Sequence, residues 1–455
     1  MREFPQTFEQ EALWIADQFM GAPSPFLETW AQHVTGPLDV PALERALSTL
    51  VRRHEVLRTT FTHGETGTVQ RVHPVGAVPF ERLPWPGGDL HETLRRAGQR
   101  PLDLTESPAR MTVYDYAPDE YVLLLQIHHV AVDDASLALL DHELSALYTE
   151  ETGGEPAKLT PPGTTLGAYA LRTREAGIAP EDLAFWDGFL DGAPPLTQLP
   201  PRARPLPERS GTACDCVRAT VPDELGRAVR AAARSLRTTP NVLMSTCLAV
   251  TVAAVNGDDV IVCSPVSRRG EPELDHVFGC LTDLLPVRYR VPADAGFADV
   301  CAAAKRVSLD VLRHRHVPFT MVGGVKRARG LTSGTRLNRV GLVLDETPGD
   351  LCLPGLSCRR VHVGGAAAKS DWLQYVVADG DGWDVRADYT TACFTADEAA
   401  VTLRQWLTVL AAVAEDPGCR CAPCSACWPG PHDAVGEPAV RRPVCVARRR
   451  RPSPM

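Results

Sequence analysis

The sequence predicts an α/β protein made of two lobes. Its 455 residues exceed the length of one ordinary domain, so two hydrophobic cores are expected. Helical and strand-like patterns alternate along the chain, which is typical of α/β folds. A proline-rich polar stretch without periodicity, residues 193–212, interrupts these patterns near the middle and is the predicted linker. The expected organisation is a first lobe over 1–192, a second lobe over 213–416 and a tail over 417–455.

The first lobe carries clear helix and strand signals. Asp39 and Pro41 form a helix start before leucines at helical spacing. Residues 121–127 form a short apolar run that predicts a buried strand, and residues 137–147 carry leucines that predict an amphipathic helix. The segment 128–134 therefore joins a strand end to a helix start, where α/β folds commonly place reactive groups.

The second lobe repeats this style. Residues 222–236 and 240–255 predict helices, Asn256 and Gly257 predict a turn, and residues 259–263 predict a buried strand. From about residue 417 the chain loses periodicity and becomes dense in proline, cysteine and arginine, which predicts a disordered tail.

The composition excludes several classes of function. A net charge of -9 provides no broad basic field, so nucleic acid is not an expected partner. The N-terminus lacks the pattern of a secretory signal, and no segment has about eighteen uninterrupted apolar residues, so no membrane partner is expected. The 14 cysteines are then expected to be reduced thiols of a cytoplasmic protein, with Cys247, Cys263 and Cys280 among apolar neighbours.

Two adjacent histidines followed by an aspartate form the main chemical motif. His128, His129 and Asp133 combine a base that titrates near neutrality with an anionic group. If the strand ends at Ile127, the two rings point to opposite faces, so one histidine serves chemistry and the other serves structure. Backbone N–H groups in the first turn of the next helix could hold a developing oxyanion. Taken alone, such a pair is more often structural than catalytic, and diverging rings disfavour a metal site.

Six segments in order carry recognisable motifs. Residues 53–61, RHEVLRTTF, resemble the R-H-E-x-L-R-T-x-F segment of nonribosomal peptide synthetase condensation domains, and residues 128–134, HHVAVDD, resemble their active-site H-H-x-x-x-D-G. The four other segments resemble further motifs of that family: residues 7–14 (T-x-x-Q-x-x-L-W), 265–269 (P-V-x-x-R), 279–288 (G-x-F-V-N-T-L-P-L-R) and 314–319 (H-Q-D-x-P-F). The resemblance covers about Thr7 to Asp416.

This resemblance implies the chloramphenicol acetyltransferase-like fold, with two lobes in a V-shaped pseudo-dimer and the active site in the tunnel between them. His129 would act in that tunnel as a base or as a positioner of the nucleophile, with His128 supporting it. Asp133 would be structural and bind Arg269 across the lobe boundary, because a buried carboxylate needs a charged or hydrogen-bonding partner.

The resemblance also implies the substrates. An acyl or aminoacyl thioester would arrive on the phosphopantetheine arm of a separate carrier protein, and a small-molecule amine or alcohol would attack it. No bound cofactor and no metal are implied. Because neither a carrier motif nor an adenylation motif is visible, the expectation is a free-standing condensation enzyme of natural-product biosynthesis.

Four positions depart from the family pattern, one of them Thr320, which replaces the glutamate of the last motif. Asp134 replaces a glycine, and its side chain would narrow the channel or hinder backbone approach to the acyl group. Asp283 and His316 replace an asparagine and an aspartate, and they mark candidate positions on the channel or acceptor side. The doubled aspartate resembles non-catalytic relatives of glycopeptide assembly that recruit oxidases, so a silent docking module is the alternative. The retained His129 favours the enzyme, and an epimerase on the same scaffold fits less well because its opening segment differs.

Other conspicuous residues are predicted to be structural. His54 is expected to make structural hydrogen bonds, and Trp14 and Phe61 to belong to the core. The tail cysteines are spaced too tightly for the usual pair of zinc hooks, which favours chance composition over a metal site: Cys419, Cys421, Cys424 and Cys427.

Overall fold

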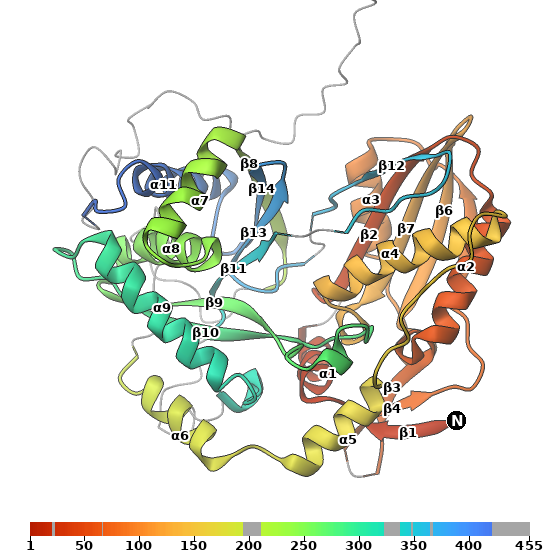
Figure 1. Cartoon of the computed structure of the whole chain (residues 1–455), viewed down its shortest axis with the longest axis horizontal. Coiled ribbons are helices and arrows are strands. Elements are labelled where there is room, and N and C mark those ends of the chain that lie inside the picture. Colours follow the sequence, from red (N-terminus) through yellow and green to blue (C-terminus); the bar gives the residue numbers. More distant parts are fainter. Residues whose placement is uncertain are drawn as a thin grey trace, which may run out of the picture.

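Each half of the protein is built on its own open sheet, and helices cover the sheets (Figure 1). The computed structural model describes residues 1–20, 23–65, 67–193, 211–322, 337–346, 349–364 and 367–420. The α/β class predicted from the sequence is confirmed. The predicted linker lies almost wholly outside the described residues, as does the predicted tail beyond residue 420.

The first half contains a 5-stranded sheet of order β12-β2-β7-β6-β5 and a 3-stranded sheet of order β1-β4-β3. The strands are β1 (Arg2–Pro5), β2 (Leu27–Thr35), β3 (Thr59–His63), β4 (Thr68–Val72), β5 (Phe80–Pro84), β6 (Ala109–Ala117), β7 (Glu120–His128) and β12 (Ser357–Arg360). The helices are α1 (Phe8–Met20), α2 (Val40–Arg53), α3 (Leu90–Gly98), α4 (Asp134–Glu151) and α5 (Leu166–Ala176), with short 3-10 turns at Glu55–Arg58 and His129–Ala131.

The predicted helix start at Asp39 is confirmed, because its side chain accepts a hydrogen bond from the amide of Ala42 and caps α2. The surroundings of strand β7 explain why its sequence is apolar without alternation. Leu123 and Leu125 face the core beneath α2 and α4, whereas Leu124 faces a second cluster with α3, so both faces are covered.

The second half contains a 6-stranded sheet of order β10-β9-β11-β13-β14-β8. The strands are β8 (Cys214–Val221), β9 (Asp259–Ser267), β10 (Thr282–Arg290), β11 (Val340–Asp345), β13 (Trp372–Asp379) and β14 (Gly382–Thr390). The helices are α6 (Pro180–Phe189), α7 (Asp223–Ser235), α8 (Pro240–Asn256), α9 (Phe297–Arg313) and α11 (Ala396–Glu415), with a 3-10 turn at Pro272–Leu274. The helices predicted over 222–236 and 240–255 are thus confirmed.

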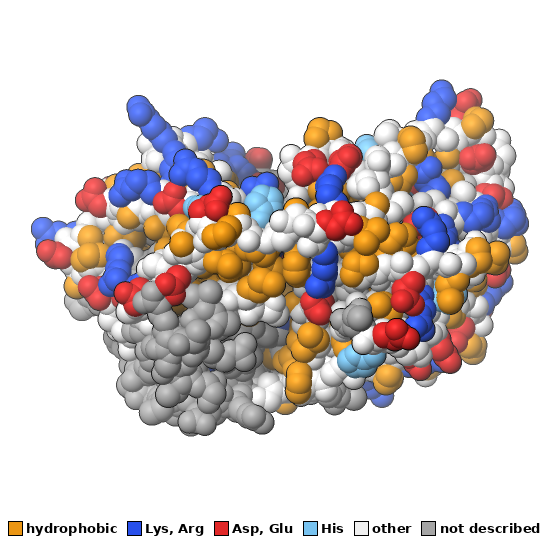
Figure 2. All heavy atoms as spheres, turned by 90° about the horizontal axis from the view of Figure 1, so that it is seen from below, with side chains coloured by type: hydrophobic (Ala, Val, Ile, Leu, Met, Phe, Trp, Pro, Cys, Tyr) orange, Lys and Arg blue, Asp and Glu red, His pale blue; other side chains and the backbone are white. Residues whose placement is uncertain are grey.

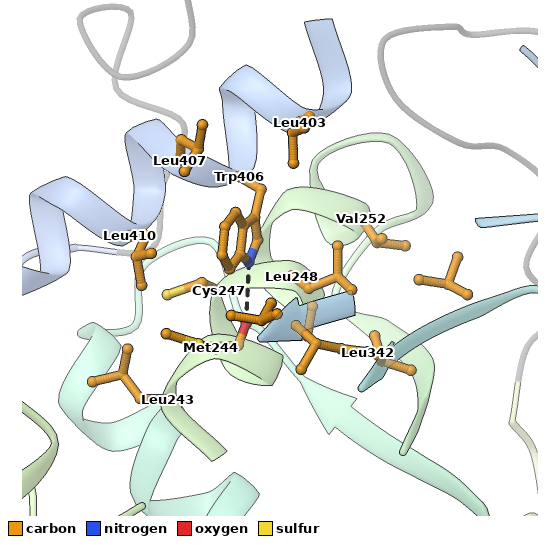
Figure 3. Close-up of a cluster of buried hydrophobic side chains, with 14 of the residues drawn as sticks. Leu243, Met244, Cys247, Leu248, Val252, Leu342, Leu403, Trp406, Leu407 and Leu410 are labelled. Carbon is orange, nitrogen blue, oxygen red and sulfur yellow. Dashed lines mark hydrogen bonds between the residues drawn. The ribbon is translucent and has the colours of Figure 1, made fainter. Parts of the chain in front are cut away.

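The core of the second half lies between its sheet and helices α7, α8, α9 and α11. Trp406 of α11 is fully buried there and donates a hydrogen bond of 3.2 Å from Nε1 to the carbonyl oxygen of Met244 in α8 (Figure 3). Apolar side chains such as Leu248 and Leu407 surround the indole, so its one polar group is satisfied inside an apolar cluster.

Two segments cross between the halves, which the predicted boundaries did not foresee. Helix α6 lies before the predicted linker, yet Trp186 packs among Cys263, Leu285 and other side chains of the second half. Strand β12 lies far along the second half, yet it pairs antiparallel with β2 and joins the first sheet (Figure 1). Amphipathic patterns show that a segment has an apolar face but not which core receives it.

The surface and the cysteines complete the description. None of the described cysteines is in a disulfide, and Cys247, Cys263 and Cys280 are buried. On the face seen in Figure 2, acidic, basic and apolar side chains are intermixed. No single helix in the described ranges has the length and apolar character to cross a membrane; α7 and α8, bent by 98°, satisfy these criteria only as a pair.

Candidate active site

The histidine motif lies at the end of β7, as expected, although the strand ends at His128 rather than Ile127. The chain then turns through His129–Ala131 before α4 begins. His128 is 2% exposed, and its Nδ1 accepts a hydrogen bond of 3.2 Å from the amide of Val130. Its Nε2 lies 3.7 Å from a carboxylate oxygen of Asp17. His128 therefore holds the turn.

His129 has different neighbours, and 22% of its side chain is exposed. Its Nδ1 lies 2.7 Å from the carbonyl oxygen of Val132. Because a carbonyl oxygen only accepts hydrogen bonds, this contact assigns the proton of the neutral ring to Nδ1. Nε2 then carries the lone pair and lies 3.9 Å from Oε1 of Glu28 in β2. The turn thus presents a solvent-accessible proton acceptor.

Glu28 and Lys369 form an ion pair beside His129, and both were missed from the sequence. Burial by itself would raise the pKa of Glu28, but Lys369 and His129 lower it to about 2. Burial lowers the pKa of Lys369, and the Glu28 carboxylate outweighs that effect, so its pKa is raised. Their side chains keep 29% and 22% exposure, so solvent reaches this charged group. The ion pair joins residues 341 positions apart, and no local motif announces it.

Asp133 joins the two halves at the start of α4. Its carboxylate oxygens Oδ1 and Oδ2 accept hydrogen bonds of 3.0 and 3.2 Å from Nη2 of Arg269, and both side chains are at most 9% exposed. The same carboxylate caps α4 by accepting from the amide of Ser136 and accepts from the amide of Leu281 at 3.0 Å. The expected contact between Asp133 and Arg269 is therefore present. It fixes the turn that carries His129.

Asp134, the first residue of α4, lies in the same charged group as His129. Its side chain is exposed to solvent. Burial raises its pKa to about 6, with a further increase from the nearby Glu28 carboxylate. Because Asp133 occupies the amide of Ser136, the amides of Asp134 and Ala135 remain the candidate oxyanion donors of this turn.

The two candidates for the channel or acceptor side have partners other than His129. Asp283 is 11% exposed and accepts hydrogen bonds from Arg268 at 3.1 Å and from the amide of Phe319 at 2.8 Å. Arg268 also lies 2.9 Å from the buried Glu9 of α1, so Asp283 belongs to an ion network between the halves. His316 lies at the surface, where partial desolvation and then the nearby charges of Arg315 and Arg268 lower its pKa. No contact described in the structure joins either candidate to His129.

The remaining predicted residues lie in the core. His54 is buried and its Nε2 lies 2.7 Å from Glu143, while Trp14 and Phe61 pack in the first core, as predicted. Within the described ranges, no group of three or more His, Cys, Asp or Glu side chains is arranged to hold a metal ion. Of the four tail cysteines, Cys419 alone falls within those ranges.

Each half has one large open sheet, of five strands in the first and six in the second, and together with the solved structures described below this places the chain in the chloramphenicol acetyltransferase-like class of fold. The family model of the condensation domain matches residues 1–426, so the chain belongs to the condensation-domain family.

Several known proteins are similar to this chain. It is 29% identical to the probable non-canonical nonribosomal peptide synthetase CymA of Salinispora arenicola, over 91% of this chain and 6% of that protein. It is 28% identical to the isonitrile lipopeptide synthase of Mycobacterium tuberculosis, over 91% of this chain and 17% of that protein. The chain thus spans a small part of the length of these relatives.

Solved structures share the fold. The X-domain from teicoplanin biosynthesis superposes with a TM-score of 0.78 at 26% identity, over 92% of this chain and 96% of that one. The first condensation domain of the calcium-dependent antibiotic synthetase superposes with a TM-score of 0.77 at 19% identity, over 93% and 99%. The expected fold family is confirmed.

Proposed function

We propose that this chain is a condensation enzyme. It joins an acyl or aminoacyl thioester, carried on the phosphopantetheine arm of a carrier protein, to an amine or alcohol and forms an amide or ester. The observation that supports this most directly is His129, whose proton is held on Nδ1 by Val132 while Nε2 remains accessible to a substrate. The proposal needs no metal and no bound cofactor, because the thioester supplies the activation.

The chemistry follows from this geometry. As the nucleophile attacks the thioester carbonyl, its proton passes to Nε2 of His129. The carbon–sulfur bond then breaks, and the same proton passes to the leaving thiolate, which regenerates the neutral ring. Asp133 and Arg269 position the turn without touching the reacting atoms. The amides of Asp134 and Ala135 would face the developing oxyanion.

The test uses carrier proteins loaded with acyl and aminoacyl thioesters, mixed with a panel of amines and alcohols and followed by mass spectrometry. Substituting His129→Ala should lower the rate about 100- to 10,000-fold, the usual contribution of a general base. The matched control is His33→Ala, since His33 pairs with Glu120 at 3.1 Å in the same sheet, remote from the motif. Equal rates in wild type and His129→Ala would contradict the proposal.

A second candidate function is a silent docking module. The similarity to the teicoplanin X-domain, and the solved complex of that X-domain with OxyB, favour it, as does the doubled aspartate at Asp133 and Asp134. The retained, accessible His129 favours the enzyme. Binding of a carrier or an oxidase by a wild-type protein that turns over no thioester would establish the docking module instead.

A further inference from the structure

We infer that Glu28 is a second hydrogen-bond acceptor for the attacking nucleophile, beside His129, and that Lys369 holds it in place. The inference rests on the proposed condensation function. It assigns a role in choosing the nucleophile to a residue outside every motif of the sequence, and it predicts a preference for a primary amine over a hydroxyl.

The distance between the two acceptors carries the argument. Nε2 of His129 and Oε1 of Glu28 lie 3.9 Å apart, and both side chains are accessible. Nε2 accepts because the ring proton sits on Nδ1, and Glu28 accepts because its lowered pKa keeps it ionised. A donor atom at about 2.9 Å from each acceptor would see them about 85° apart, which is narrower than the angle between two N–H bonds but is reached with a small bend of each hydrogen bond.

That angle distinguishes the possible nucleophiles. A primary amine has two N–H bonds, so it can donate one to His129 and the other to Glu28 while its lone pair faces the thioester. A hydroxyl has a single O–H bond and leaves one acceptor without a donor. Hydrogen bonds to ionised acceptors are stronger than neutral ones, so the second contact favours the amine.

Lys369 provides the support. It comes from the segment just before β13 of the second half, whereas Glu28 lies in β2 of the first half. The ion pair therefore places the Glu28 carboxylate only when the halves are together. A carboxylate without this partner would turn toward water, and one of the two acceptors would be lost.

The protons balance. As the nitrogen–carbon bond forms, one amine proton passes to Nε2 of His129, and it later passes to the thiolate released when the carbon–sulfur bond breaks. The second N–H donates to Glu28 throughout and remains in the product amide. Glu28 takes up no proton, so it is a positioning residue for the nucleophile and His129 remains the base.

The test compares two acceptors of one skeleton, 2-phenylethylamine and 2-phenylethanol, with the same carrier thioester. Glu28→Gln should lower kcat/KM for the amine about tenfold more than for the alcohol, the typical loss of one charge-assisted hydrogen bond. Glu120→Gln is the matched control, because Glu120 also faces a histidine in the same sheet but lies away from the motif. It should leave both rates unchanged.

A charge swap, Glu28→Lys with Lys369→Glu, separates this role from a purely structural one. It keeps an ion pair between the halves, so it should recover the melting temperature of wild type without recovering the amine preference. The role of Glu28 would be overturned if the charge swap recovered both the melting temperature and the amine preference, or if Glu28→Gln lowered the rates with the amine and the alcohol equally. The condensation function would not be affected by either result. If wild type formed neither amide nor ester from any pair, the condensation function would fall, and this inference with it.

Discussion

Removing one partner of the buried pair between Asp133 and Arg269 should destabilise the protein strongly. Asp133→Ala deletes the cap of α4, worth about 1 kcal/mol, and leaves a buried guanidinium unpaired, worth about 3–5 kcal/mol, so the loss should be about 4–6 kcal/mol. Arg269 would keep its bonds of 2.7 Å to the carbonyl oxygens of Leu274 and Val277, but these do not neutralise its charge.

Urea denaturation followed by circular dichroism measures this loss, and a double-mutant cycle isolates the pair. Arg269→Ala in the Asp133→Ala background removes the stranded charge, so the double variant should be more stable than the sum of the single losses predicts, by more than about 1 kcal/mol. The control is Arg82→Gln, which breaks an exposed pair with Asp115 and should cost less than about 1 kcal/mol. Strict additivity of the two single losses would refute a buried, mutually dependent pair.

Two further predictions concern packing and pH. A Cβ added to Gly226 in α7 would lie 1.9 Å from the carbonyl oxygen of Asp381, so Gly226→Ala should destabilise by about 1–3 kcal/mol; Gly188→Ala in α6, with no atom within 4 Å, should instead stabilise by about 0.5–1 kcal/mol. Thermal melts measure both effects, and equal losses of stability in the two variants would contradict the packing described. Burial raises the pKa of Asp134 to about 6. With rising pH the unfolded chain therefore loses this proton before the folded chain does, and the free energy of unfolding falls. Asp134→Asn should therefore gain stability over wild type between about pH 4 and about pH 7, and a constant difference across that range would argue against a raised pKa.

Local patterns accounted for the elements and for the position of the histidine motif. Asp39 caps a helix through its own side chain, and the apolar run 121–127 forms a strand because both faces are covered; each signal lies within a few residues. The contact between Asp133 and Arg269 was foreseen through family resemblance. Its physical basis, a carboxylate that needs a charged partner when buried, matches the geometry found.

Long-range partners were beyond the sequence. Glu28 and Lys369 approach each other only because β2 and the segment before β13 meet across the halves, and neither residue has a local signature. Asp283 was predicted on the channel or acceptor side, and nothing in the sequence indicated that Arg268 binds its carboxylate at 3.1 Å. Motif spacing identifies residues of a reactive type. The contacts in the folded protein then decide whether another residue already binds the reactive group.

The strand exchange through β12 has a consequence during synthesis. Until Ser357–Arg360 leave the ribosome, β2 is the outermost strand of the first sheet, and its backbone donors and acceptors on that side have no strand beside them. An uncovered edge can pair with another chain. The first sheet is therefore complete only after most of the chain has been made, and until then the edge of β2 is open to pairing with another strand.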